Sequence, residues 1–361
     1  MRRCRRHLKT FKVIPKKIIK IMVLVTISAF SLAISSCNKL PEKVIEETRL
    51  FMGTVVQIKV SLRPGDDEKK ARDAIDKAFD EVKRVEDVYS VYNHASEISR
   101  INKLRKNEKL QISDGVFNLI LKSIDYSKRT FGTFDITVKP IIDLWHKAKT
   151  RGRVPSEDEI SRALGHVGYK NIVLDETNRT ISFKKEEMSI DMGGIAKGYA
   201  TDRAINILED AGINNALVTS GGDMYCLGKK SRTELWKVGI RHPRNKDKLF
   251  LEMSLKDRAI STSGDYERYF ILDGKRYSHI IDPRTGYPIG DNIVSASVIT
   301  SDSTTSDILA TSMCILGEKG FYAIKEFGDI DAVLVMQESG HLIVRMSEGI
   351  KKRYDISQEK L

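Results

Sequence analysis

The chain has 361 residues, with 61 Lys and Arg against 49 Asp and Glu, which gives a formal net charge of +12 and a pI near 9.3. Nine of the basic residues and none of the acidic ones lie in residues 1–20, so residues 37–361 carry a net charge of only +3. This small charge removes the main argument for nucleic-acid binding. The 325 residues from position 37 onward suffice for one large domain or two closely packed ones.

Residues 1–36 have the features of a secretory signal peptide. A basic segment ends at Lys20, an apolar run over 21–34 follows, and Ser35 and Ser36 precede Cys37. The run is shorter than the roughly 20 residues that a transmembrane helix needs, although an uncleaved signal anchor is the alternative. A cysteine after small residues resembles the bacterial lipobox. We therefore expect Cys37 to be lipidated and to anchor the mature chain to the cell membrane, facing the periplasm or the exterior.

The chain beyond Cys37 is expected to form a tether, one folded unit and a tail. The tether covers residues 37–47, the folded unit residues 48–350 and the C-terminal tail residues 351–361. Only two further cysteines are present, Cys226 and Cys314, and their spacing fits no cysteine-ligated metal site. A disulfide between them would need an oxidising compartment, and two buried free thiols are the favoured interpretation.

Helical and strand patterns alternate irregularly along the folded unit, which favours an α+β fold over a doubly wound parallel sheet. Some helix ends are marked: Ser156 and Glu159 have the spacing of a capping box, and Gly212 is placed to end a helix. In chain order, we predict a strand over 55–60, helices over 71–88 and from 113 to 124, a helix beginning at 156, strands over 172–174 and 180–183, a helix over 195–211, strands over 216–219 and 294–300, a helix over 304–316 ended by Gly317, and a strand over 332–336.

One segment is suited to binding phosphate. Asp191-x-Gly193-Gly194 turns from a strand into a helix, and Lys197 lies in the first turn of that helix. Free N–H groups at a helix start attract phosphate, glycines allow it to approach, and a lysine adds a point charge. The spacing matches neither of the two common nucleotide-binding motifs, so a glycine that only serves helix packing explains this segment equally well.

Two further segments carry polar groups suited to chemistry. Asp307 and Thr311 are four residues apart and share one helix face, where they offer Mg²⁺ the oxygen ligands that it prefers. His279 precedes the turn Asp282-Pro283-x-x-Gly286 and has a side chain suited to proton transfer. Each segment taken alone has a simpler explanation than a catalytic one. The first is explained by an ordinary polar helix start, and the second by a structural histidine.

Seven segments in one order, these three among them, resemble the ApbE family, the FAD:protein FMN transferases, over about residues 48–350. The resemblance implies an α+β catalytic unit of mixed sheets and packed helices, related to the T-fold. The segments are Met52-Gly53-Thr54, Ser96-Glu97-Ile98-Ser99, Phe134-Asp135-Ile136-Thr137-Val138-x-Pro140, Asp191-x-Gly193-Gly194-x-Ala196-Lys197-Gly198-Tyr199, Ser220-Gly221-Gly222-Asp223, Ser278-His279-Ile280-Ile281-Asp282-Pro283-x-Thr285-Gly286 and Asp307-x-x-x-Thr311.

The resemblance also implies which residues bind the ligands. Mg²⁺ would lie between Asp307, Thr311 and the main-chain carbonyl of Gly194. Some members carry a second Asp at position 310, which is Ala310 here, so the metal would have one carboxylate fewer in this chain. The flavin of FAD would contact Met52, Tyr92, Thr133, Phe134, Asp135, Asp191, Lys197 and Ile281.

The implied reaction is attack of a Ser or Thr hydroxyl of an acceptor protein on the FMN phosphorus of FAD, with release of AMP. Mg²⁺, Lys197 and the amides of Gly193 and Gly194 would neutralise and position the pyrophosphate. We hypothesise that His279 is the base, so that His279 and Asp307 are the expected catalytic residues. The acceptors expected from the resemblance are subunits of membrane redox complexes, such as Rnf or the sodium-pumping NADH:quinone reductase.

Three other functions compete with this one. A magnesium-dependent FAD pyrophosphatase would use water in place of the acceptor hydroxyl, and the sequence hardly separates it from a transferase. A non-catalytic flavin-binding lipoprotein has little need of the pairing of Asp307 with Thr311. An unrelated solute-binding lipoprotein is disfavoured by the ordered segments. The motifs of serine hydrolases and zinc peptidases are absent from the sequence.

Overall fold

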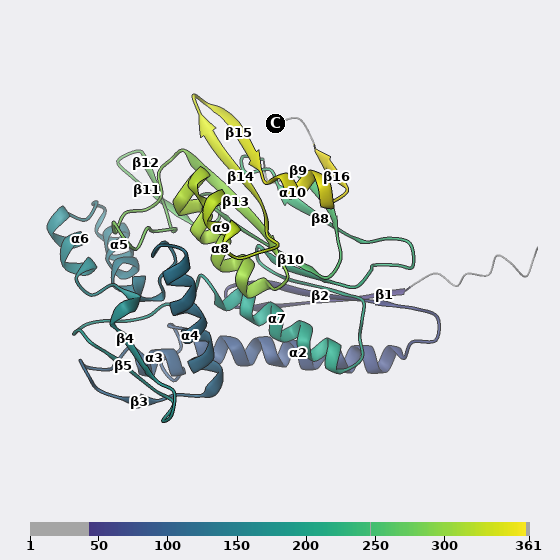
Figure 1. Cartoon of the computed structure of the whole chain (residues 1–361), viewed down its shortest axis with the longest axis horizontal. Helices are drawn as coiled ribbons and strands as arrows, with labels where there is room; N and C mark the ends of the chain where they lie inside the picture. Colours follow the sequence, from purple (N-terminus) through teal and green to yellow (C-terminus); the bar gives the residue numbers. More distant parts are fainter. Residues whose placement is uncertain (1–42, 246, 359–361) are drawn as a thin grey trace, which may run out of the picture. The chain divides into compact units, whose positions relative to one another are not determined.

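The computed structural model describes residues 43–245 and 247–358 (Figure 1), so the predicted signal peptide and Cys37 lie outside the described residues. Strand β1 (Lys43–Phe51) pairs antiparallel with β2 (Thr54–Leu62) along its whole length. Residues 43–47, predicted to belong to the tether, are therefore part of the folded unit. Most side chains of β1 are exposed or half-buried, as expected for an edge strand. Such a strand can have a polar sequence, and for this reason the stretch resembles a tether in the sequence.

An eight-stranded antiparallel sheet is the centre of the domain (Figure 1). The strand order is β1-β2-β6-β7-β10-β13-β14-β15, so strands far apart in the sequence become neighbours. The predicted α+β class is confirmed. Besides β1 and β2, the sheet contains β6 (Ala216–Ser220), β7 (Asp223–Leu227), β10 (Arg258–Gly264), β13 (Ile293–Thr300), β14 (Asp331–Glu338) and β15 (His341–Met346).

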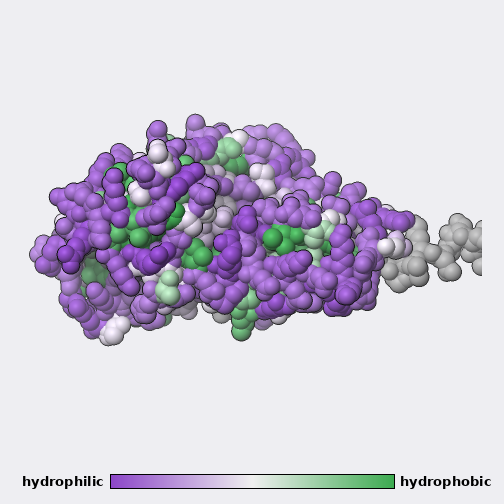
Figure 2. All heavy atoms as spheres, turned by 90° about the horizontal axis from the view of Figure 1, so that it is seen from below, coloured by the Kyte–Doolittle hydropathy of each residue, from purple (hydrophilic) through white to green (hydrophobic). Residues whose placement is uncertain are grey.

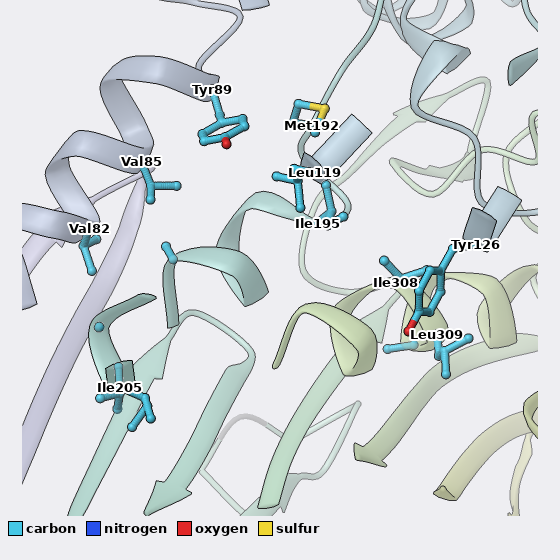
Figure 3. Close-up of a cluster of buried hydrophobic side chains, with 14 of the residues drawn as sticks. Val82, Val85, Tyr89, Leu119, Tyr126, Met192, Ile195, Ile205, Ile308 and Leu309 are labelled. Carbon is cyan, nitrogen blue, oxygen red and sulfur yellow. The ribbon is translucent and has the colours of Figure 1, made fainter. Parts of the chain in front are cut away.

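Three helices cover one face of this sheet: α2 (Glu68–Tyr89), α7 (Ala196–Asp210) and α8 (Ser303–Leu316). Helix α7 packs against both of the others. The buried residues of α2 recur at spacings of three and four, as the sequence predicted. Figure 3 shows part of the core beneath these helices, to which α4 (Asp114–Arg129) also contributes; its labelled residues are Val82, Val85, Tyr89, Leu119, Tyr126, Met192, Ile195, Ile205, Ile308 and Leu309.

A smaller sheet of β8 (Trp236–Arg241), β9 (Leu249–Leu255) and β16 (Ile356–Gln358) encloses a second core with the other face. Strand β14 shows the alternation clearly, because Leu334 faces the helices while Val333 and Val335 face the second core. Strand β16 pairs with β9, and α10 (Glu348–Arg353) precedes it. Residues 351–358, predicted as a tail, therefore belong to the fold.

A third, smaller core surrounds Trp145, whose indole N–H donates to the carbonyl of Gly286 at 2.8 Å. It lies among α5 (Lys139–Arg151), α6 (Glu157–Leu164) and the hairpin of β11 (Tyr269–Leu272) and β12 (Lys275–Ser278). Both hydrogen bonds of the predicted capping box of α6 are present. The remaining elements are α3 (Glu97–Ile101), β3 (Leu110–Gln111), η1 (Ile136–Val138), η2 (Tyr169–Asn171), β4 (Ile172–Asp175), β5 (Thr180–Phe183), η3 (Gly317–Lys319) and α9 (Gly320–Lys325).

Helices α7 and α8 approach each other most closely at Gly198. A Cβ atom at this position would lie 2.3 Å from the carbonyl oxygen of Ser303 and 2.9 Å from Cβ of Asp307. Both distances are shorter than any real contact of a Cβ atom, so only glycine allows this spacing. The contact thus fixes how α7 lies against α8.

Large apolar side chains on the surface are scattered. In the described ranges, no helix is both long and apolar enough to cross a membrane. The face shown in Figure 2 is mainly hydrophilic, with hydrophobic side chains visible in separate areas. The most exposed apolar side chains, Leu50, Tyr92, Phe131 and Tyr322, belong to four different segments. Single exposed side chains of this kind are normal and indicate no particular function.

We predict that Gly198→Ala destabilises the domain by about 1–3 kcal/mol, because the added methyl group forces α7 and α8 apart. Thermal and urea unfolding would measure the change. Gly115→Ala in α4 is the matched control, since its Cβ would make only ordinary contacts of 3.5 Å or more, and it should be neutral or slightly stabilising. Equal stability of the Gly198 variant and the wild type would contradict this account of the helix contact.

Candidate active site

Two buried carboxylates flank the ammonium group of Lys197 in the first turn of α7. Its Nζ atom lies 3.2 Å from both carboxylate oxygens of Asp307 on α8, and 3.0 Å from Oδ2 of Asp223 at the start of β7. The side chains of Asp223 and Asp307 are 2% and 4% exposed, whereas that of Lys197 is 29% exposed. Lys197 is therefore the member of this cluster that reaches solvent.

The main chain of α7 holds Asp307 in place. The N–H of Gly198 donates to Oδ2 of Asp307 at 3.1 Å, which the missing side chain of Gly198 makes accessible. Thr311 follows one helical turn later on α8. Asp307 and Thr311 therefore share one face of α8, as their spacing predicts, and their role as metal ligands stays a prediction.

The start of α8 is fixed by two further carboxylates. Asp202 on α7 accepts hydrogen bonds from the N–H groups of Ser303 and Thr304 at 2.7 and 2.8 Å. The side chain of Asp302 caps the helix by accepting from the N–H of Thr305 at 2.9 Å. The first N–H groups of a helix have no partner within it, so these bonds stabilise the end of α8 that carries Asp307.

The cluster contains two acidic groups and one basic group. Burial and the neighbouring charge of Asp307 together raise the pKa of Asp223 to about 7, while Lys197 opposes the rise. Burial also disfavours the charged form of Lys197, but the two carboxylates outweigh this and raise its pKa above the ordinary value. Lys197 is thus protonated, and one cation is shared between two acids. When both acids are ionised the cluster carries a net negative charge, which attracts a further cation.

The chemistry of these donors fits Mg²⁺. The carboxylate of Asp307 and the hydroxyl of Thr311 are hard oxygen ligands, and the Thr311 hydroxyl lies 3.2 Å from that of Ser263. A Cβ on Gly194 would be 4.0 Å from the Thr311 oxygen, so the main chain of Gly194 lies close by, as predicted. Ala310 is fully buried in the main core and supplies no ligand. No group of three or more His, Cys, Asp or Glu residues suited to a metal occurs among residues 43–245 and 247–358.

Several residues predicted to contact the flavin already have partners within the protein. The carboxylate of Asp135 accepts from the N–H and hydroxyl of Thr137 and from the N–H of Tyr169, at 2.6 to 2.8 Å. The hydroxyl of Thr133 donates to the carbonyl of Thr130 at 2.8 Å. These side chains shape the loop before η1, and burial raises the pKa of Asp135 although its hydrogen bonds oppose the rise.

The segment around Asp191 joins this loop to α7. The N–H of Asp191 donates to the carbonyl of Ile136 at 2.7 Å, and a Cβ on Gly194 would lie 3.4 Å from the ring of Phe134. The side chain of Asp191 accepts from the N–H of Gly193 at 2.7 Å. One of the two amides predicted to receive phosphate therefore already bonds to a carboxylate of its own turn. Burial raises the pKa of Asp191, which this bond partly offsets.

The structure brings a second group of predicted residues to the same region. Met52 has a left-handed backbone, with φ of +53°, and its N–H donates to the carboxylate of Glu86 at 2.7 Å. The turn that follows packs on the Ser220–Asp223 turn, since the N–H of Gly221 donates to the carbonyl of Val55 at 3.1 Å. A Cβ on Gly53 would lie 3.8 Å from the guanidinium group of Arg268.

The other two predicted flavin residues lie in different surroundings. Tyr92 is 80% exposed, on the loop after α2. Ile281 is buried in the third core and forms a β-bridge with Pro288. Their roles in binding the flavin remain predictions. Cys226 and Cys314 are buried free thiols, as favoured from the sequence.

His279 follows β12 and is held by the main chain of Arg268. Its Nδ1 atom lies 2.8 Å from the Arg268 carbonyl oxygen, which can only accept a hydrogen bond. In the neutral imidazole Nδ1 therefore carries the proton, and Nε2 keeps a free lone pair. Although His279 is an exposed residue, desolvation of its ring by the surrounding protein and the charges of Arg268 and Lys197 lower its pKa to about 4, while the hydrogen bond to the Arg268 carbonyl opposes this shift. The residue retains exposed surface, so a hydroxyl group has access to it.

In the sequence, Asp223 is part of a motif without an assigned role, and Glu86 and Arg268 belong to no motif. The signal for Asp223 is a carboxylate directly after a strand and two glycines, where the chain turns from one strand into the next. Glu86 and Arg268 carry no such signal, because they act through contacts with residues that are distant in the chain.

The lowered pKa of His279 predicts a pH dependence of stability. The unfolded chain binds a proton near pH 6.5 at this residue, and the folded chain only near pH 4. Between these values the unfolded state binds more protons, so the free energy of unfolding falls as the pH falls. We expect His279→Gln to flatten this dependence in urea unfolding between pH 6.5 and 4. The control His341→Gln changes an exposed histidine on β15 and should keep the wild-type slope; parallel curves for all three proteins would contradict the prediction.

Comparison with known proteins agrees with the predicted family resemblance. Residues 52–334 match the model of the ApbE family. The FAD:protein FMN transferase of Vibrio cholerae is 32% identical over 310 residues, 85% of this chain and 91% of its own length. The structure of the ApbE protein of Thermotoga maritima (33% identity, TM-score 0.77) and that of the flavin transferase ApbE of Vibrio cholerae (29%, 0.74) each match 86% of this chain and 99% of their own. The chain therefore belongs to the ApbE family.

Proposed function

We propose that this chain is a magnesium-dependent FAD:protein FMN transferase that moves FMN from FAD to a Ser or Thr hydroxyl of an acceptor protein and releases AMP. The curated relatives bear the name FAD:protein FMN transferase, and the chain matches most of their length. The structural observation that carries the proposal is the contact of Lys197 with the buried carboxylate of Asp307, one helical turn before Thr311.

Breaking a pyrophosphate bond requires neutralisation of its negative charge and exact positioning of the reacting groups. Lys197 is protonated and reaches solvent, so its ammonium group is available to a phosphoryl oxygen. Asp307, Thr311 and the carbonyl of Gly194 are the groups that would hold Mg²⁺. Bound there, the metal would neutralise charge on the pyrophosphate and help to orient it.

We propose that His279 removes the proton from the hydroxyl group of the acceptor protein. As the hydroxyl oxygen forms its bond to the FMN phosphorus, the bond from that phosphorus to the AMP oxygen breaks, and the hydroxyl proton passes to Nε2. The carbonyl of Arg268 keeps Nδ1 protonated and thereby leaves Nε2 as the acceptor. The lowered pKa keeps the ring neutral at neutral pH, which makes the base available but limits its strength.

The experiment that tests this proposal combines the full chain in detergent with FAD, MgCl₂ and a candidate acceptor domain from a membrane redox complex. Intact mass of the acceptor and release of AMP are measured together. We expect the acceptor to gain one FMN for each AMP released, and both signals to disappear with a chelator. Release of AMP and free FMN without any gain by a known acceptor would support the pyrophosphatase, and intact bound FAD would support flavin storage.

Variants of the two catalytic candidates sharpen this test. We expect His279→Ala to lower the rate of transfer by roughly 10²–10⁴-fold without loss of FAD binding, whereas His341→Ala on β15 should have no effect. Asp307→Asn should remove the dependence of the rate on Mg²⁺. A normal rate for the His279 variant would exclude it as the base, and an unchanged Mg²⁺ dependence would exclude Asp307 as a ligand.

We also propose that Cys37 is lipidated after removal of residues 1–36, so that the enzyme is anchored to the cell membrane and faces the periplasm or the exterior. The basic and apolar segments before Ser35-Ser36-Cys37 support this. Strand β1 begins at residue 43, so the anchor and the domain are separated by only five residues. A tether this short would keep the domain near the membrane surface, where subunits of complexes such as Rnf or the sodium-pumping NADH:quinone reductase would be its acceptors.

Cys37→Ala should abolish attachment of lipid and release the enzyme from the membrane fraction. Mass spectrometry of the mature N-terminus and fractionation of cells would measure these two effects. Cys226→Ala is the matched control, since this buried thiol lies within the domain and should leave the membrane association unchanged. A Cys37 variant that remains in the membrane fraction would instead support the uncleaved signal anchor.

A further inference from the structure

Asp223 is a buried acid that the proposed reaction does not use. Its side chain is 2% exposed, and its Oδ2 atom is among the few buried polar atoms of the described residues without a hydrogen-bond partner. This atom lies 3.0 Å from Nζ of Lys197, which makes the lysine its ionic partner. Burying a carboxylate is costly, so one that is retained in this position needs a physical explanation.

Lys197 contacts both acids of the cluster. It donates to the two oxygens of Asp307 at 3.2 Å each and lies slightly closer to Asp223. If Asp307 binds Mg²⁺, as proposed above, the cation and the ammonium group compete for the same carboxylate. A lysine with Asp307 as its single partner would form a closed, neutral pair with that carboxylate, and a metal ion would have to break it.

We propose that Asp223 is a positioning residue that acts through Lys197: it keeps an ionic partner for the ammonium group, so that Asp307 is free to bind a divalent cation. The inference rests on the proposed metal site at Asp307. Asp223 belongs to β7 in the central sheet, while Lys197 and Asp307 belong to the helices. The lysine already contacts both acids, so it can keep Asp223 as its partner when Asp307 binds the metal, without movement of the helices.

The same arrangement keeps Lys197 next to the metal site, where its charge can act on the pyrophosphate. After Asp307 takes the metal ion, the lysine stays beside the site and keeps its charge, since Asp223 still stabilises the protonated form. A charged lysine held close to the metal is then available to the pyrophosphate. Asp223 thus links binding of the cation to the position of Lys197, although it need not contact the metal or FAD.

The test is a double-mutant cycle on binding of Mn²⁺, used as a paramagnetic probe of the magnesium site, with the full chain in detergent and without FAD. Electron paramagnetic resonance measures the free Mn²⁺. We expect Asp223→Asn to weaken binding by about tenfold and Lys197→Met, which removes the competing cation, to tighten it. In the double variant, the effect of Asp223→Asn should shrink to less than about threefold, because the lysine through which Asp223 acts is absent.

Three results would overturn the proposal. The first is that Asp223→Asn changes the affinity for Mn²⁺ equally with and without Lys197, which would make Asp223 a direct ligand or a simple source of charge. The second is that Asp223→Asn leaves the affinity for Mn²⁺ unchanged. The third is that Lys197→Met does not bind Mn²⁺ more tightly than the wild type. The last result decides the question even if Asp223→Asn does not fold, which circular dichroism would show. Asp331→Asn is the matched control, since this acid is also buried and paired with an arginine, Arg353, and it should leave Mn²⁺ binding unchanged.

These measurements are independent of the transferase assay. FMN transfer by the wild type, together with no coupling between Asp223 and Lys197, would overturn the inference and leave the proposed function intact. Coupling in the binding experiment, without transfer to any acceptor, would instead contradict the proposed function while the role of Asp223 stands.

Discussion

The contact between α7 and α8 at Gly198 is the constraint on which the site depends. Because no side chain separates the helices there, the N–H of Gly198 reaches Asp307, and the preceding residue, Lys197, contacts the same carboxylate. Residues that are 110 positions apart in the sequence are thus joined by backbone packing. Groups held on packed helices keep their geometry better than groups on loops, which a site for phosphoryl transfer requires.

The site lies where the helical layer packs on the central sheet, at the start of the interior strand β7. Asp223 comes from the sheet, and Lys197 and Asp307 come from the helices, so the three charges are assembled from two layers. Both layers are well supported, because the middle of the sheet is buried on both faces. A rigid frame of this kind can hold two buried acids close together. In a flexible chain, the two acids would move apart and become hydrated.

Several residues predicted to bind the flavin also stabilise the fold. The carboxylates of Asp135 and Asp191 accept main-chain hydrogen bonds that shape the two loops next to α7. Ile281 packs in the third core, and Met52 adopts a left-handed turn conformation. A substitution at any of these positions would change the local fold as well as any contact with flavin. Loss of flavin binding alone would therefore not separate the two roles.

The sequence by itself determined the main helices and strands, the capping box at Ser156, the family and the placement of Asp307 and Thr311 one turn apart on a helix. These depend on periodicity and short spacings, which are local properties of the chain. Only the tertiary structure decided that residues 43–47 and 356–358 complete sheets, since their mostly exposed side chains carry little hydrophobic pattern. It also decided that Asp223 shares Lys197 with Asp307, because that contact depends on how a sheet and two helices pack together.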